Sequence, residues 1–241
     1  MLGFGIDLAG YTTGKTSLAV VEIENQAANA TLLRGSAFSK KRGSDDSLEK
    51  VVAEEVADLR RCLSIGPVAV DIPIDLQGLP DPKNPQTIWA LTRRPIDQAV
   101  NAMPPFADRI GAPVARFAAI MRGGNFHEFL GKSLFEAYPA ITLKFLKIAG
   151  GYKGKKGANA LISLCKTLKI EPHIKNDDDI DAIICALTAA APIALVHDFS
   201  ELKIQGPMPA GFRVPKSLTF DKISVVEADF TAWMERREIS P

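Results

Sequence analysis

The first forty residues alternate short apolar runs with turn-forming residues. Residues 2–9, 17–23 and 31–38 are each rich in Leu, Ile, Val, Phe or Ala, and glycine or asparagine lies between them. Runs of this length, separated by short turns, are typical of strands joined in an antiparallel meander. We therefore predict three consecutive strands, and the first is interrupted near its end by Asp7.

A helix and two further strands are predicted next. Residues 47–63 carry apolar side chains three and four positions apart, which predicts an amphipathic helix. Residues 67–73 are almost wholly apolar, as expected of a parallel strand buried on both faces, and this strand also ends near an aspartate, Asp71. Residues 133–138 predict a fifth strand, which Pro139 stops.

Proline and glycine divide the rest of the chain. Residues 74–95 are rich in proline and polar residues, so we predict a long loop, a class of segment that is often functional. A tail from residue 201 mixes strand-like runs with proline and ends in a predicted helix over 226–237. We predict one domain over residues 1–241, with a core over about 2–200 and a C-terminal extension over 201–241. The other predicted helices lie within 95–130 and at 141–148 and 158–168.

Charge is most concentrated in a predicted helix over 176–190, which opens with four carboxylates in five positions. Asn176 or Asp177 is a suitable N-cap, and acidic residues in a first turn complement the helix dipole. Asp178 and Asp181 are three positions apart, which places them on one face with Cβ atoms about 5–6 Å apart. At an effective dielectric near 20 such a pair repels by roughly 3 kcal/mol. From this helix alone, helix capping and a metal or catalytic site are equal alternatives.

Asp7 and Asp71 lie at the ends of two buried strands. An isolated buried carboxylate loses its hydration, so each needs a partner, a metal ion or hydrogen bonds from loop amides. In a parallel arrangement, the carboxyl ends of neighbouring strands are where ligands bind. Together with the acidic pair Asp178 and Asp181, these residues favour a site for Mg²⁺ or Mn²⁺, which prefer oxygen ligands.

Several other polar residues are weaker candidates. Glu136 lies in an apolar strand and is a candidate to support the ligands or face the substrate, with a solvent-facing edge carboxylate as the alternative. Asp75 and Asp97 lie in or near the long loop and are interpreted as solvated. The candidate phosphate-binding cations, which as ordinary surface charges need no function, are Arg93, Arg94, Lys153, Lys155 and Lys156.

Composition narrows the class of protein. The chain has 241 residues, 46% of them hydrophobic, and a formal net charge of +1, which argues against a protein that coats nucleic acid by bulk charge. Its three cysteines lack metal-binding spacing and are interpreted as buried free thiols, as in a reducing compartment. We find no signal-peptide pattern and no membrane span, so we expect a cytoplasmic protein with no membrane partner. The sequence does not determine the oligomeric state.

These motifs together resemble a known fold and, more narrowly, a known family. The glycine-flanked Asp7 strand, the meander, the Asp71 strand and the late acidic helix resemble the ribonuclease H-like fold. Over about residues 2–200 the chain is also similar to a predicted nuclease family, "domain of unknown function 429". The motifs that carry the family resemblance are Val70-Asp71-Ile72-Pro73, Arg93 to Asp97, Phe135 to Ala140, and Asp178-x-x-Asp181-Ala182.

The resemblance implies an architecture and a mechanism. The architecture is an α/β three-layer fold, with a mixed five-stranded sheet of order 3-2-1-4-5, strand two antiparallel, and helices on both faces. In ribonuclease H-like nucleases an acidic cluster holds two divalent metals, one activating water and one stabilising the leaving oxygen. Carried over, Asp7 would bridge the metals, Asp71 would complete one site, and Asp178 with Asp181 would complete the other. Because adjacent acids leave the register ambiguous, the alternatives to Asp178 are Asp177 and Asp179.

We therefore predict a divalent-metal-dependent nuclease, a hydrolase that cleaves DNA or RNA and so has nucleic acid as its partner. One alternative is a non-catalytic binding or regulatory module on the same fold. Another is an ATP-dependent phosphotransferase, because sugar kinases and actin-like ATPases share the superfamily and residues 5–9 with the turn that follows resemble their first phosphate loop. Separately, Gly14-Lys15-Thr16 is similar to the end of a P-loop. The first P-loop glycine would fall at Ala9, however, and a strand rather than a helix follows.

Overall fold

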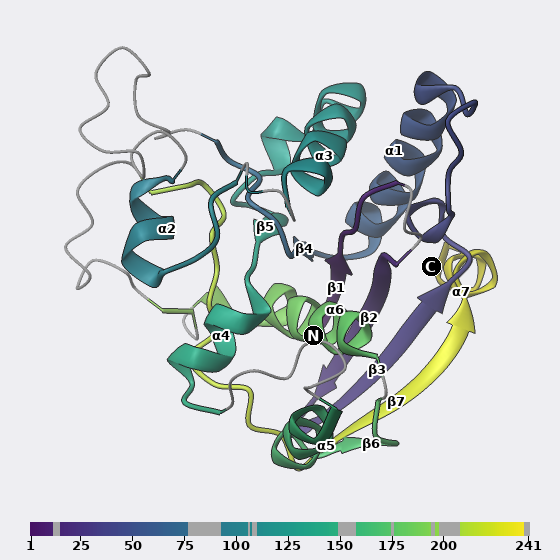
Figure 1. The fold of residues 1–241 in the computed structure, drawn as a ribbon. Helices are drawn as coiled ribbons and strands as arrows, with labels where there is room; N and C mark the ends of the chain where they lie inside the picture. Colours follow the sequence, from purple (N-terminus) through teal and green to yellow (C-terminus); the bar gives the residue numbers. More distant parts are fainter. Residues whose placement is uncertain are drawn as a thin grey trace.

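The centre of the molecule is a mixed β-sheet (Figure 1). The computed structural model describes residues 1–11, 15–76, 93–105, 107, 110–148, 158–174, 176–193, 196–197 and 208–238. Seven strands of this part of the chain form one sheet of order β5-β4-β1-β2-β3-β7-β6. β2 is antiparallel to both neighbours, and the other paired strands are parallel. The strands are β1 (Leu2–Asp7), β2 (Ser17–Glu24), β3 (Ala27–Arg34), β4 (Val68–Val70), β5 (Leu134–Glu136), β6 (Ile170–Glu171) and β7 (Lys222–Asp229).

The five predicted strands are present in the predicted order, with β2 antiparallel as expected. The predicted number was wrong, because β7 and β6 extend the sheet beyond β3. β7 pairs with β3 in parallel along its whole length, so the C-terminal extension contributes to the sheet. The helix predicted over 226–237 was also wrong at its start. Ile223 and Val225 alternate with more exposed residues and face the core, and α7 (Phe230–Glu238) begins only after this strand.

Helices cover both faces of the sheet, which gives the three-layer arrangement of the ribonuclease H-like fold (Figure 1). On one face, α5 (Ala158–Thr167) and α6 (Asp177–Ala190) pack on β2, β3 and β7. On the other, α1 (Leu48–Ile65), α3 (Gly111–Gly124) and α7 share an apolar core with β1 and β4. Two short helices, α2 (Pro95–Val100) and α4 (Pro139–Phe145), share a smaller apolar cluster. The 3-10 helices are η1 (Ala37–Ser39) and η3 (Phe126–Phe129).

None of the described helices combines the length and the apolar character needed to cross a bilayer.

Helix α6 lies close to β1 because small residues meet at the contact. The backbone of Gly3 faces Ala186 and Ala190, and that of Gly5 faces Ala182 and Ala186. A methyl group added at either glycine would overlap backbone atoms of the helix. Backbone atoms cannot move aside as a flexible side chain can, so this packing fixes how near α6 approaches the strand.

Replacing Gly5 by alanine tests this contact. Because the added methyl group would meet helix backbone, we expect the free energy of unfolding to fall by about 3 kcal/mol or more, the upper end for overpacked cores. Urea denaturation measures the change. The matched control is Gly43→Ala, whose methyl group would meet no atom within 4 Å. Equal stability of the two variants would contradict a close α6–β1 contact.

Candidate metal centre

Three aspartates from separate segments meet at the carboxyl ends of two neighbouring strands. Asp7 is the last residue of β1, and Asp71 follows the parallel strand β4, where its backbone N–H donates to the Ile6 carbonyl at 2.9 Å. Asp181 lies in the second turn of α6 and is fully buried, whereas the other two are half-buried. One carboxylate oxygen from each of the three lies within 4.8 Å of the other two.

Carboxylates this close oppose one another electrostatically. At an effective dielectric near 20, a pair of charges about 5 Å apart repels by roughly 3 kcal/mol. A divalent cation between them removes this cost, and carboxylate oxygens are the ligands that Mg²⁺ and Mn²⁺ prefer. The donor chemistry of Asp7, Asp71 and Asp181 therefore fits a hard divalent ion.

A cavity of about 490 Å³ adjoins this acidic centre. Asp7, Asp71 and Asp178 all line it, so the acid one turn before Asp181 in α6 faces the same space. Its other polar side chains include those of Lys15 and Asn101. Much of the remaining lining is apolar and includes Ile72, Ala102, Met103, Ile110, Pro113 and Ile141.

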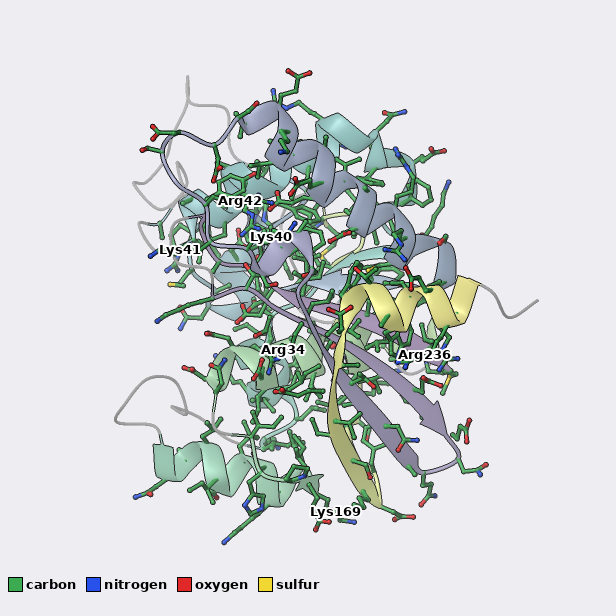
Figure 2. All side chains as sticks on the ribbon, turned by 90° about the vertical axis from the view of Figure 1, so that its right-hand side faces the viewer. Arg34, Lys40, Lys41, Arg42, Lys169 and Arg236 are labelled. Carbon is green, nitrogen blue, oxygen red and sulfur yellow. The ribbon has the colours of Figure 1, made fainter. Side chains whose placement is uncertain are left out.

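The acids beside Asp178 in the first turn of α6 have different surroundings. Asp179 is buried and accepts hydrogen bonds from Ser17 Oγ at 2.7 Å and from Arg34 Nη1 and Nη2 at 2.7 and 2.9 Å. Arg34, labelled in Figure 2, reaches Asp179 from the end of β3. Asp177 is half-buried and does not line the cavity. Successive helical residues point about 100° apart, which is why Asp178 and Asp179 face different neighbours.

A buried arginine organises the segment that follows β4. Arg94 Nη2 donates to Glu136 at 2.5 Å and to Asp97 at 2.7 Å, and all three side chains are fully buried. Arg94 Nη1 donates to the Asp75 carbonyl at 2.6 Å, and Glu136 accepts the Ile74 N–H at 2.8 Å. Because Ile74 and Asp75 belong to the loop that leaves β4, this network fixes that loop.

The charges of this network stabilise one another. Burial alone would lower the pKa of the Arg94 guanidinium, but its hydrogen bonds to Glu136 and Asp97 outweigh burial and hold the pKa above its ordinary value. Tyr138 Oη accepts a hydrogen bond from Arg94 at 2.7 Å, and burial, followed by the charge of Glu136, raises the pKa of this phenol well above its ordinary value. At neutral pH Arg94 is therefore a cation and Tyr138 a neutral phenol.

A second buried arginine, Arg116 of α3, holds the segment that follows β1. Its Nη1 donates to the Ala9 carbonyl at 2.6 Å and to Thr16 Oγ1 at 3.1 Å. Its Nε donates to Glu55 at 3.1 Å, and its guanidinium lies 4.5 Å from the ring centroid of Tyr11. Burial, and next the charge of Glu55, raises the pKa of Tyr11 to about 12. The loops that leave β1 and β4 are thus each anchored by an arginine.

Several expectations for polar residues were wrong. Glu136 is fully buried, so it is not a solvent-facing edge carboxylate. Asp97 is also fully buried and Asp75 is 8% exposed, so neither is solvated. Arg94, a predicted phosphate-binding candidate, is fully buried and binds protein carboxylates. Arg93 is half-buried and does not line the cavity. The other candidate cations, Lys153, Lys155 and Lys156, lie outside the described residues.

Among the cavity-lining residues that the sequence did not indicate are Lys15, Asn101 and Met103. None of them belongs to a strand or helix, so hydrophobic periodicity carries no signal for them. Asn101 is the C-cap of α2 in the left-handed region, at φ 56°, a conformation for which asparagine is enriched. This preference can predict where a helix ends, but it cannot predict that Asn101 and the residues after it line a cavity.

Comparison with known proteins gives no family assignment. No family model matches the chain, and no curated protein does. Two solved structures are similar to the chain. Thermus thermophilus RuvC has 16% sequence identity and a TM-score of 0.42, and the match covers 86% of this chain and 100% of that one. T. thermophilus RuvC in complex with a Holliday junction substrate has 16% identity and a TM-score of 0.41, and the match covers 78% of this chain and 91% of that one. Similarity this low carries no functional argument, so the strand order and layers define the fold.

Removing Glu136 tests the buried network. The variant Glu136→Ala removes one of the carboxylates that balance the buried charge of Arg94. We therefore expect the free energy of unfolding to fall by about 3–5 kcal/mol. The matched control is Glu227→Ala, since Glu227 pairs with Arg34 at 2.7 Å but its side chain is 63% exposed. Exposed pairs contribute about 0–1 kcal/mol. If urea denaturation gave the two variants similar losses, the Arg94 network would not stabilise the fold as described.

Proposed function

We propose that this protein is a divalent-metal-dependent nuclease that hydrolyses phosphodiester bonds in DNA or RNA. The observation that carries the proposal is the convergence of Asp7, Asp71 and Asp181, with oxygens within 4.8 Å of one another, beside a cavity. Two divalent ions held by such a cluster would supply an activated water and would stabilise the leaving oxygen. The resemblance to the predicted nuclease family, "domain of unknown function 429", points to the same activity.

Each acid has an assigned role in this proposal. Asp7 and Asp71 project from the ends of adjacent parallel strands and would hold one Mg²⁺ or Mn²⁺ ion, with Asp7 shared between two. Asp181 and Asp178 would complete the second position, because Asp178 lines the cavity that the substrate would enter. Asp179 takes no part, since Arg34 and Ser17 neutralise and orient it.

Basic residues near the cavity would contact the substrate phosphates. Lys15 lines the cavity itself. Lys40, Lys41 and Arg42 gather in the segment before α1 (Figure 2), and the Arg42 N–H donates to the Tyr11 carbonyl at 3.1 Å, which places the segment beside the turn after β1. Arg42 and Lys40 pair with Glu54 at 2.7 and 3.5 Å. The Lys40 side chain is 52% exposed, and such exposed pairs contribute about 0–1 kcal/mol, so a phosphate can replace the carboxylate as its partner.

Two alternatives fit the structure less well. A non-catalytic binding module would not need three carboxylates to converge at an electrostatic cost. A P-loop phosphotransferase would need a helix N-terminus after the glycine-rich turn, and the strand β2 (Ser17–Glu24) follows there. We also propose a cytoplasmic location, because Cys62, Cys165 and Cys185 are all buried free thiols.

Neutralising one acid tests the activity. We expect Asp71→Asn and Asp181→Asn each to lower Mn²⁺-dependent cleavage of a labelled oligonucleotide by more than about 100-fold. Mutating residues that only hydrogen-bond to metal ligands already lowers activity about 10–100-fold, and loss of a ligand itself should lower it further. The control is Asp221→Asn, which removes an exposed carboxylate just before β7, at the opposite end of the sheet from Asp7. Full activity in both site variants, with the fold intact by circular dichroism, would refute the proposal.

Stability without metal gives a second test of the same site. Because the acids repel one another, we expect Asp71→Asn to be more stable than the wild type in EDTA, with a free energy of unfolding about 1–3 kcal/mol higher. Mn²⁺ at 100 times its Kd should stabilise the wild type by about 2.7 kcal/mol and the variant much less. Urea denaturation with and without Mn²⁺, with Asp221→Asn as control, measures both effects. A wild type that Mn²⁺ does not stabilise would have no cation site here.

A further inference from the structure

The cavity beside the acidic centre has a largely apolar wall, whereas surfaces that bind a phosphate backbone are rich in basic and polar groups. The acids Asp7, Asp71 and Asp178 contribute one part of the lining. Another part comes from the α2–α3 connection and the first turn of α3, where Ala102, Met103 and Ile110 of the connection and Pro113 of the helix contribute apolar surface. A sugar–phosphate backbone is strongly hydrated, and burying it against apolar side chains costs free energy that no hydrogen bond returns.

A nucleobase suits this wall, because it has two flat apolar faces and a polar edge. Met103 is a large apolar residue that remains 48% exposed. Thioether sulfurs make favourable contacts with aromatic rings, which a base supplies. Asn101, two residues before it, also lines the cavity, and its amide has both a donor and an acceptor for a base edge.

Tyr138 also lines the cavity, and other parts of the protein contact its hydroxyl and its ring. Its hydroxyl accepts a hydrogen bond from the buried Arg94 at 2.7 Å, and its ring packs on Phe212 with centroids 5.5 Å apart. The ring is therefore held in place before any ligand arrives, which lowers the entropic cost of binding. The volume of about 490 Å³ lies within the range of small-molecule sites and holds a single nucleotide unit rather than a duplex.

We propose that the cavity binds one unpaired nucleotide, with its base on the Met103 side and its phosphate at the acidic centre. This inference rests on the proposed nuclease function, because the acids would hold the ions that contact the phosphate. In a duplex the bases are stacked inside and do not reach such a wall unless they leave the stack. The preferred substrates are therefore single strands, frayed ends and unpaired nucleotides, and not the interior of a duplex.

Cleavage assays test the substrate class. We expect Mn²⁺-dependent cleavage of a labelled single strand to be at least about 10-fold faster than cleavage of the same strand in a blunt duplex. The duplex must first unpair the nucleotide, which costs a few kcal/mol and therefore slows cleavage by at least this factor. Met103→Ala should raise KM for the single strand about 3- to 10-fold, as expected for loss of a sulfur–ring contact, and change kcat little. The control is Ile162→Ala, an apolar residue of α5 that is 43% exposed and does not line the cavity.

A binding measurement separates this inference from the nuclease proposal. The chain has five methionines, so methyl-¹³C methionine labelling gives few signals, and the Met103→Ala variant assigns one of them. In Ca²⁺, deoxynucleoside 5′-monophosphates should shift the Met103 signal, inorganic phosphate should not, and the signal of Met234, which is fully buried elsewhere in the core, should stay unchanged.

The outcomes are distinguishable. If no divalent metal supports cleavage of any oligonucleotide, the nuclease proposal fails, and a nucleotide-specific Met103 shift would still support the base-binding cavity. If duplex and single strand are cleaved equally and Met103→Ala has no effect on KM, the nuclease proposal stands and this inference is overturned. A Met103 signal that nucleotides leave unchanged, or that inorganic phosphate shifts as much, also overturns it.

Discussion

The close contact between α6 and β1 is the constraint on which the rest of the site depends. Gly3 and Gly5 present bare backbone to a helix face made of Ala182, Ala186 and Ala190, so the helix and the sheet approach until backbone atoms meet. Any larger side chain at these glycines would push α6 outward. Because Asp181 belongs to this helix and Asp7 to this strand, the same contact sets the distance between two of the three acids.

The remaining geometry comes from hydrogen bonds rather than from apolar packing. The parallel ladder between β1 and β4 sets Asp71 beside Asp7, and two buried arginines hold the loops that leave these strands. A buried ion pair is weak evidence for stability, because desolvation offsets much of its attraction. Its value here is geometric. Arg94 and Arg116 each have several donors in a fixed plane, and each bonds at once to a carboxylate and to a loop carbonyl.

The sequence predicts the acids at strand ends from local patterns, whereas the order of the strands was implied by the resemblance to the ribonuclease H-like fold. A short apolar run that ends in aspartate is visible without a structure, and Asp7 and Asp71 were found in this way. The position of Asp179 was not predictable, since one residue of helical rotation decides whether an acid faces the cavity or Arg34. Asp97 was misassigned as solvated, because its burial depends on a charge network that reaches Glu136, far along the chain. β6 has two residues, too few for a periodic signal.

The acidic centre and the apolar wall of its cavity come from different parts of the fold, and this separation has a consequence for function. The acids come from strand ends and from α6, which the central packing holds rigid, whereas Met103 lies in the connection between α2 and α3. Changes in the connection can alter the shape and polarity of the wall without moving an acid, so the specificity of the cavity can vary while the acidic centre is preserved. The acids have no such freedom. Their mutual repulsion opposes folding, and the α6–β1 packing together with the β1–β4 ladder keeps them close, so a substitution at the glycines would disturb the acidic centre although no glycine belongs to it.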